Sequence, residues 1–123
     1  MSGPIRQRIL TALRCTEEIV GELIPVIMPN MNLFELEEII TNVKNSIREL
    51  DNHVHDVRTA REAWGNLTQR LTQAERPGED QTNVAFNDDN GVGDKVHRAN
   101  TRLRELRALE TVIQRRINQI NAV

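Results

Sequence analysis

Hydrophobic side chains recur at alternating intervals of three and four residues from Leu33 to Leu71. This average spacing of 3.5 residues continues without a change of phase, and it is typical of a helix that packs lengthwise against other helices. A start signal comes directly before it, because Asn32 and Glu35 have the spacing of a capping box. The pattern therefore predicts one long helix over residues 33–74, which we expect to continue through Gly65.

Helical periodicity also appears on both sides of this segment. Residues 4–24 begin with Pro4, which suits a first helical turn, and they end before Pro25, which disfavours helical backbone in the preceding residue. Residues 94–121 begin with Asp94, a good helix cap. The intervening residues 75–93 hold three glycines and five acidic residues, which predicts a mobile acidic loop with Val84 and Phe86 as candidate anchors of its middle.

The expected helix lengths predict an extended architecture. Each outer helix is connected to one end of the central helix, so both should run back along it in antiparallel fashion and overlap only near its middle. We predict a single all-α domain over residues 1–123, an extended three-helix coiled-coil-like assembly that leaves apolar surface uncovered. The predicted interaction seam comprises Leu36, Ile40, Val43, Ile47, Leu50, Val54, Val57, Trp64, Leu71, Leu103, Leu106, Ile113, Ile117 and Ile120.

Two charged residues interrupt this seam, Arg61 in the central helix and Glu110 in the last one. Arg61 lies 13 residues before Ala74, and Glu110 lies 16 residues after Asp94. An antiparallel hairpin would bring them to nearly the same level, which predicts an interhelical ion pair. Such a pair would fix the register more than it would stabilise the fold, because desolvation offsets much of the attraction.

Composition narrows the class of protein. The formal net charge of -2 over 123 residues predicts no strong attraction of the whole chain to nucleic acid or membranes. A single cysteine, Cys15, cannot form an internal disulfide and fits a reducing compartment. We find no signal-peptide pattern and no apolar run near the about 20 residues that a membrane span needs. We expect an intracellular protein, cytoplasmic or nuclear, without a membrane span.

Few residues in the sequence suggest a catalytic, metal-binding or phosphate-binding site. His53 and His55 are two positions apart, so on a helix they point in nearly opposite directions and cannot share a metal ion. Cys15 has no histidine near it in the sequence, and we interpret it as a small helix residue. The residues around Gly91 fit neither the calcium-loop nor the phosphate-loop spacing. We predict no enzyme activity, no cofactor and no metal.

The last predicted helix is basic. Residues 94–123 hold seven basic and three acidic residues, a net charge of +4, whereas residues 75–93 hold one basic and five acidic, a net charge of -4. An arginine-rich helix face can contact phosphates, but it can also simply be solvated or balanced by an acidic loop. The candidate phosphate contacts are Arg98, Arg102, Arg104, Arg107, Arg115 and Arg116.

An acidic break separates two short segments of these long amphipathic helices. They are Ala63-Trp64-Gly65-Asn66-Leu67-Thr68 and Leu103-Arg104-Glu105-Leu106. In this general character the chain resembles the N-terminal helical region of Gag-like polyproteins of BEL/Pao retrotransposons. The resemblance implies a role in self-association or assembly, or a domesticated fragment of such a polyprotein.

These patterns predict a helical protein–protein interaction module that self-associates as a dimer or higher oligomer, or that scaffolds a helical partner. Two alternatives stay open. One is a nucleic-acid-binding protein that uses the arginine-rich helix, and the other is a regulatory or tethering three-helix domain.

Overall fold

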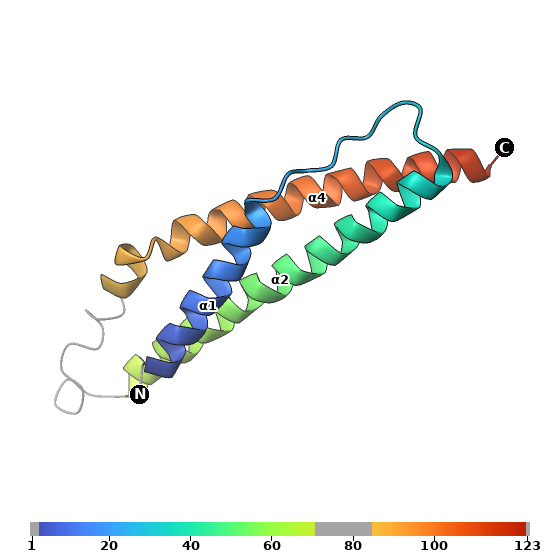
Figure 1. Ribbon diagram of the computed structural model, residues 1–123. Coiled ribbons are helices and arrows are strands. Elements are labelled where there is room, and N and C mark those ends of the chain that lie inside the picture. Colours follow the sequence, from blue (N-terminus) through green and yellow to red (C-terminus); the bar gives the residue numbers. More distant parts are fainter. Residues whose placement is uncertain (1–2, 71–84, 123) are drawn as a thin grey trace.

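A computed structural model describes residues 3–70 and 85–122 of the chain, with side chains placed for all of these except 68–70. Three long helices dominate it: α1 (Gly3–Val20), α2 (Leu33–Arg70) and α4 (Val92–Asn121). Figure 1 shows an elongated molecule in which α1 and α4 both lie along α2 and run opposite to it. The described residues form helices, turns and connections without any strand. The all-α fold with one long central helix is confirmed.

The start of α2 follows its cap signal. The helix begins at Leu33, and the backbone N–H of Glu35 donates to Oδ1 of Asn32 at 2.8 Å. This bond satisfies one of the amides that the first helical turn leaves without a partner. The predicted end of the helix, residues 71–74 with the seam residue Leu71, lies outside the described residues.

Helix α1 ends at Val20, four residues earlier than the expected position before Pro25. The reason is a distant side chain, since Arg102 of α4 donates to the backbone oxygens of Val20 at 2.9 Å and of Glu22 at 3.0 Å. A guanidinium group at the end of a helix satisfies carbonyls that have no intrahelical partner and interacts favourably with the helix dipole. The chain can therefore leave the helix at Gly21.

The last part of the expected acidic loop is helical rather than irregular. Residues 85–89 form a helical turn, and α4 begins at Val92, two residues before Asp94. The ring of Phe86 lies 5.2 Å from that of Trp64, and Val92 is fully buried. Gly91 joins the two helical pieces with a φ of 57°, a left-handed conformation that glycine adopts without steric cost.

The core has two parts. The Trp64 cluster, at the end where α1 covers α2, comprises Ile9, Ala12, Leu13, Val57, Ala60, Trp64 and Val92. The hairpin cluster lies between α2 and α4 and comprises Ile19, Leu36, Ile40, Val43, Leu50, Val54, Ala99, Leu103, Leu106, Ile113 and Ile117. Helix α1 contributes only Ile19 to the buried residues of the hairpin cluster, so another segment has to cover it.

That segment is the connection of residues 21–32, which we call the strap. It runs from the end of α1 along α4 to the far end of the molecule, where α2 begins (Figure 1). Arg102 holds its first residues, and Arg116 of α4 donates to the backbone oxygen of Pro29 at 2.6 Å. Ile27 and Met31 pack against the hairpin cluster. The strap thus takes the place that a third helix occupies at the other end.

Candidate functional site

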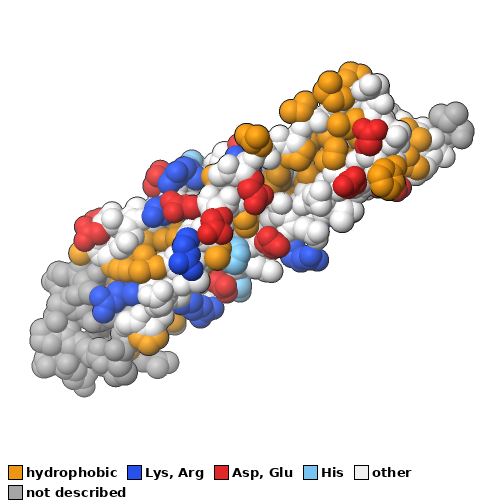
Figure 2. All heavy atoms as spheres, viewed as in Figure 1, with side chains coloured by type: hydrophobic (Ala, Val, Ile, Leu, Met, Phe, Trp, Pro, Cys, Tyr) orange, Lys and Arg blue, Asp and Glu red, His pale blue; other side chains and the backbone are white. Residues whose placement is uncertain are grey.

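Large exposed hydrophobic side chains gather around the strap. They belong to the strap itself, to the first turn of α2 and to the last turns of α4, and Figure 2 shows hydrophobic atoms collected at this end of the molecule. Leu23 is 95% exposed and Phe34 is 74% exposed. We name this region the strap surface; its residues are Leu23, Val26, Met28, Phe34, Val112 and Ile120.

Contacts with the strap explain why residues distant in sequence share this surface. Val112, Arg116 and Ile120 follow one another at intervals of four, so they lie on one face of α4. Arg116 is the residue that bonds to Pro29 of the strap. The two exposed hydrophobic side chains on α4 therefore flank the point where the strap is attached.

Charges of opposite sign lie at the edges of the strap surface. Glu38 follows Phe34 by four residues on α2, and Arg115 follows Val112 by three on α4, so each charge shares a face with an exposed hydrophobic side chain. Both are exposed, and neither forms an ion pair within the described part of the chain. The ion pairs among the described residues involve other side chains, for example Asp51 with Arg107 at 3.6 Å.

The predicted interaction seam is mostly internal. Eleven of its members are buried in the two core clusters, and Ile47 is half-buried. Ile120, which is 39% exposed, belongs to the strap surface instead. The heptad pattern therefore identified side chains that hold α1, α2 and α4 together, whereas most of the exposed large hydrophobic residues, such as Phe34 and Val112, lie outside the heptad positions.

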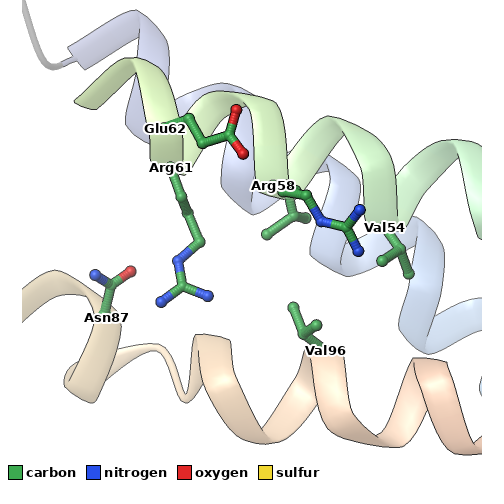
Figure 3. A pocket seen from close by; sticks show the side chains of 7 residues that line it. Val54, Arg58, Arg61, Glu62, Asn87 and Val96 are labelled. Carbon is green, nitrogen blue, oxygen red and sulfur yellow. The ribbon is translucent and has the colours of Figure 1, made fainter. Parts of the chain in front are cut away.

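The structure does not bring Arg61 and Glu110 together. Arg61 lines a pocket with Asn87 and Val96 (Figure 3), while Arg107, one turn before Glu110, pairs with Asp51. Asp51 and Arg61 are ten residues apart, or about 15 Å along a helix. The register differs from the expectation because the helical turn at 85–89 and the start of α4 already pack on Trp64, so α4 reaches further towards the start of α2.

Most of the candidate phosphate-binding arginines have partners within the protein. Arg102 and Arg116 bond to backbone oxygens of the α1 end and the strap. The others contact side chains: Arg98 pairs with Glu17 and Asp94, Arg107 pairs with Asp51, and Arg104 donates to Thr101. Of the six, only Arg115 has no such partner among the described residues. This arrangement favours a structural role for the basic face over phosphate binding.

Cys15 and His53 line the same open groove of about 510 Å³ between α1 and α2, a proximity that the sequence does not reveal. No described hydrogen bond joins them, and Asp56 in the same groove pairs with Arg8 at 3.4 Å. His55 is exposed and lies 3.4 Å from the hydroxyl of Thr59. The groove is thus lined by a thiol from α1 and an imidazole from α2, and the contacts of the described residues do not arrange them as a nucleophile and base.

Within the described ranges, no group of three His, Cys, Asp or Glu side chains is placed to hold a metal ion. None of the helices there is long and apolar enough to cross a membrane. No protein-family model, curated protein or solved structure matches the chain significantly. The strap surface, with its flanking charges, is the feature of this fold that suits an interaction with another macromolecule.

Proposed function

We propose that this chain is a non-enzymatic helical interaction module that self-associates through the strap surface. The observation that carries the proposal is the concentration of six large exposed hydrophobic side chains at one end of the molecule. Monomeric proteins seldom expose large contiguous apolar patches, and such patches usually mark an interface.

A second copy of the chain is the partner that the charges favour. In a symmetric dimer both subunits use the same surface, so a two-fold axis through the strap surface can place α2 of one subunit against α4 of the other. Glu38 of one copy would then approach Arg115 of the other, at the rim of the apolar contact. Opposite charges at a rim mainly fix orientation and speed association.

The two-helix character of this end supports the same arrangement. The hairpin cluster is enclosed by α2, α4 and the strap, with Ile19 as the one buried contribution of α1. Two such ends packed together would form a four-helix layer around the exposed side chains of both copies. The resemblance to Gag-like helical regions, which implies assembly, is a further argument for self-association.

Size-exclusion chromatography with light scattering tests the proposal. The wild-type chain is expected to show a dimer mass at high micromolar concentration. Leu23→Glu and Phe34→Glu should each shift the mass towards the monomer, since each places a charge inside the apolar contact. Leu10→Glu is the matched control, because Leu10 is 37% exposed on α1, outside the strap surface. A strictly monomeric wild-type chain, or equal dissociation by the control, would exclude this interface.

A charge exchange tests the choice of partner. Arg115→Glu should weaken the dimer, because two acidic side chains would then meet at the rim. Combining it with Glu38→Arg should restore the dimer. If the double variant dissociates as readily as Arg115→Glu alone, the two copies are not arranged with α2 against α4.

A further inference from the structure

A second feature, distinct from the strap surface, is a cavity of about 390 Å³ between α2, the helical turn at 85–89 and the start of α4 (Figure 3). Among the described residues, its apolar lining consists of Val54, Val57 and Val96. Val54 belongs to the hairpin cluster and Val57 to the Trp64 cluster, while Val96 packs against both. The cavity therefore opens where the two parts of the core meet, and its volume is within the range of small-molecule pockets.

Two arginines on α2 project over this apolar floor. Arg58 and Arg61 are three residues apart and so lie on the same side of the helix. In Figure 3 the guanidinium group of Arg61 extends towards the turn that holds Asn87, and that of Arg58 lies on the side of Val54. Neither arginine has an ion-pair or hydrogen-bond partner among the described residues, in contrast to Arg98, Arg102 and Arg107.

The chemistry of this lining indicates what it would bind. Guanidinium groups present paired N–H donors that match the two oxygens of a carboxylate. The valines beneath them offer an apolar surface to the body of the same molecule. Glu62 also lines the cavity, and its negative charge disfavours a ligand with two charges, such as a phosphate dianion.

We propose that this cavity binds a small monocarboxylate with a short apolar body, with Arg58 and Arg61 holding the carboxylate and the valines contacting the body. The ligand would relieve the repulsion between two neighbouring cations and would bridge α2 and α4 at the junction of the two core clusters. This site is independent of self-association through the strap surface, which lies at the other end of the molecule.

Titration of hexanoate into the full chain, followed by amide and guanidinium NMR signals, tests the proposal. Hexanoate should produce saturable shifts centred on Arg58, Arg61 and Val96. Acetate, which lacks the apolar body, and inorganic phosphate, which lacks the body and carries more charge, should bind more weakly. Hexanamide, which has the body without the charge, should give no saturable shifts at these residues; equal binding of hexanamide would overturn the proposal.

Substitutions of single arginines distinguish binding in this cavity from non-specific binding of anions to the surface. Arg58→Gln and Arg61→Gln should each weaken hexanoate binding by about tenfold, since each removes a charge-assisted hydrogen bond. Arg14→Gln is the matched control, because Arg14 is an exposed arginine on α1 away from the cavity. Unchanged circular dichroism would show that the variants are folded. Unchanged affinity in both cavity variants, or shifts confined to the strap surface, would refute the site.

Discussion

The two ends of the molecule cover the same helix in different ways. At one end α1, α4 and the turn at 85–89 surround the second half of α2, and Trp64 is fully buried. At the other end α2 and α4 pack together beneath an extended strap, and Leu36 is equally well buried. The interiors are alike, whereas the outer surfaces differ. Among the described residues, the exposed large hydrophobic side chains lie at the strap end, with the exception of Leu10 on α1.

This contrast shows how an extended segment differs from a helix when it covers a hydrophobic core. A helix can turn its apolar stripe inward and its polar residues outward. An extended segment points successive side chains to different sides, and every one of residues 23–28 of the strap is apolar. Ile27 and Met31 pack against the core, whereas Leu23, Val26 and Met28 are exposed. The strap is more apolar than its covering role requires, which is consistent with a second contact on its outer side.

The largest effect should come from the core of the end that α1 covers. Trp64→Ala is expected to lower the free energy of unfolding by about 3–5 kcal/mol, because it removes a fully buried indole and leaves a cavity. Phe34→Ala is the matched change at the strap end, where 74% exposure predicts a loss of less than about 0.5 kcal/mol. Urea unfolding at low protein concentration, where self-association does not contribute, measures both. Similar losses would contradict the difference in burial.

An intermediate effect should come from the attachment of the strap. Arg102→Gln is expected to cost about 1–3 kcal/mol, because the Arg102 side chain is only 18% exposed and bonds to two backbone oxygens. Amide hydrogen exchange should accelerate in residues 20–32 more than elsewhere. Arg104→Gln is the control on the same helix, since Arg104 is exposed and its one side-chain hydrogen bond among the described residues is to Thr101. Uniform acceleration across all helices in Arg102→Gln would mean that the arginine acts on global stability and does not hold the strap.

The sequence predicts where the helices lie along the chain better than it predicts how they pack along one another. The period of 3.5 residues and the Asn32 cap locate the start of α2, because both depend on neighbours along the chain. The early end of α1 depends on Arg102, which is 82 residues from Val20, and no local pattern reveals such a contact. The sequence between Pro25 and Asn32 predicts an apolar connection, but its length does not show that it lies along α4. The helix lengths predict uncovered apolar surface, but only the path of the strap in the structure shows where this surface lies.

The pocket lined by Arg61 shows the same limit, because the sequence does not reveal how α4 is aligned along α2. Arg61 stood out in the sequence as a charge in an apolar seam, and the pairing with Glu110 followed from an assumed loop at residues 75–93. Phe86 and Val92 are the signals against that assumption, because apolar side chains inside an acidic stretch favour packing on the core. Their burial against Trp64 moves the start of α4 along α2 and leaves Arg61 opposite Asn87 and Val96. A single error in loop length thus changes every interhelical contact that follows.

The smallest predicted effect tests this register directly. Asp51 and Arg107 are both more than half exposed and lie 3.6 Å apart, so a double-mutant cycle with Asp51→Asn and Arg107→Gln should give a coupling energy of about 0.2–1 kcal/mol. A second cycle with Arg61→Leu and Glu110→Leu should be additive within about 0.3–0.5 kcal/mol, because these residues are far apart and share no partner. The two cycles use the same pair of helices and the same measurement, the urea unfolding midpoint. Coupling in the second cycle and none in the first would shift α4 by about 13 residues along α2, since Glu110 follows Arg107 by three residues and Arg61 follows Asp51 by ten. That shift would also take Val96 away from Arg58 and Arg61, so the register tested here is the one on which the carboxylate site depends.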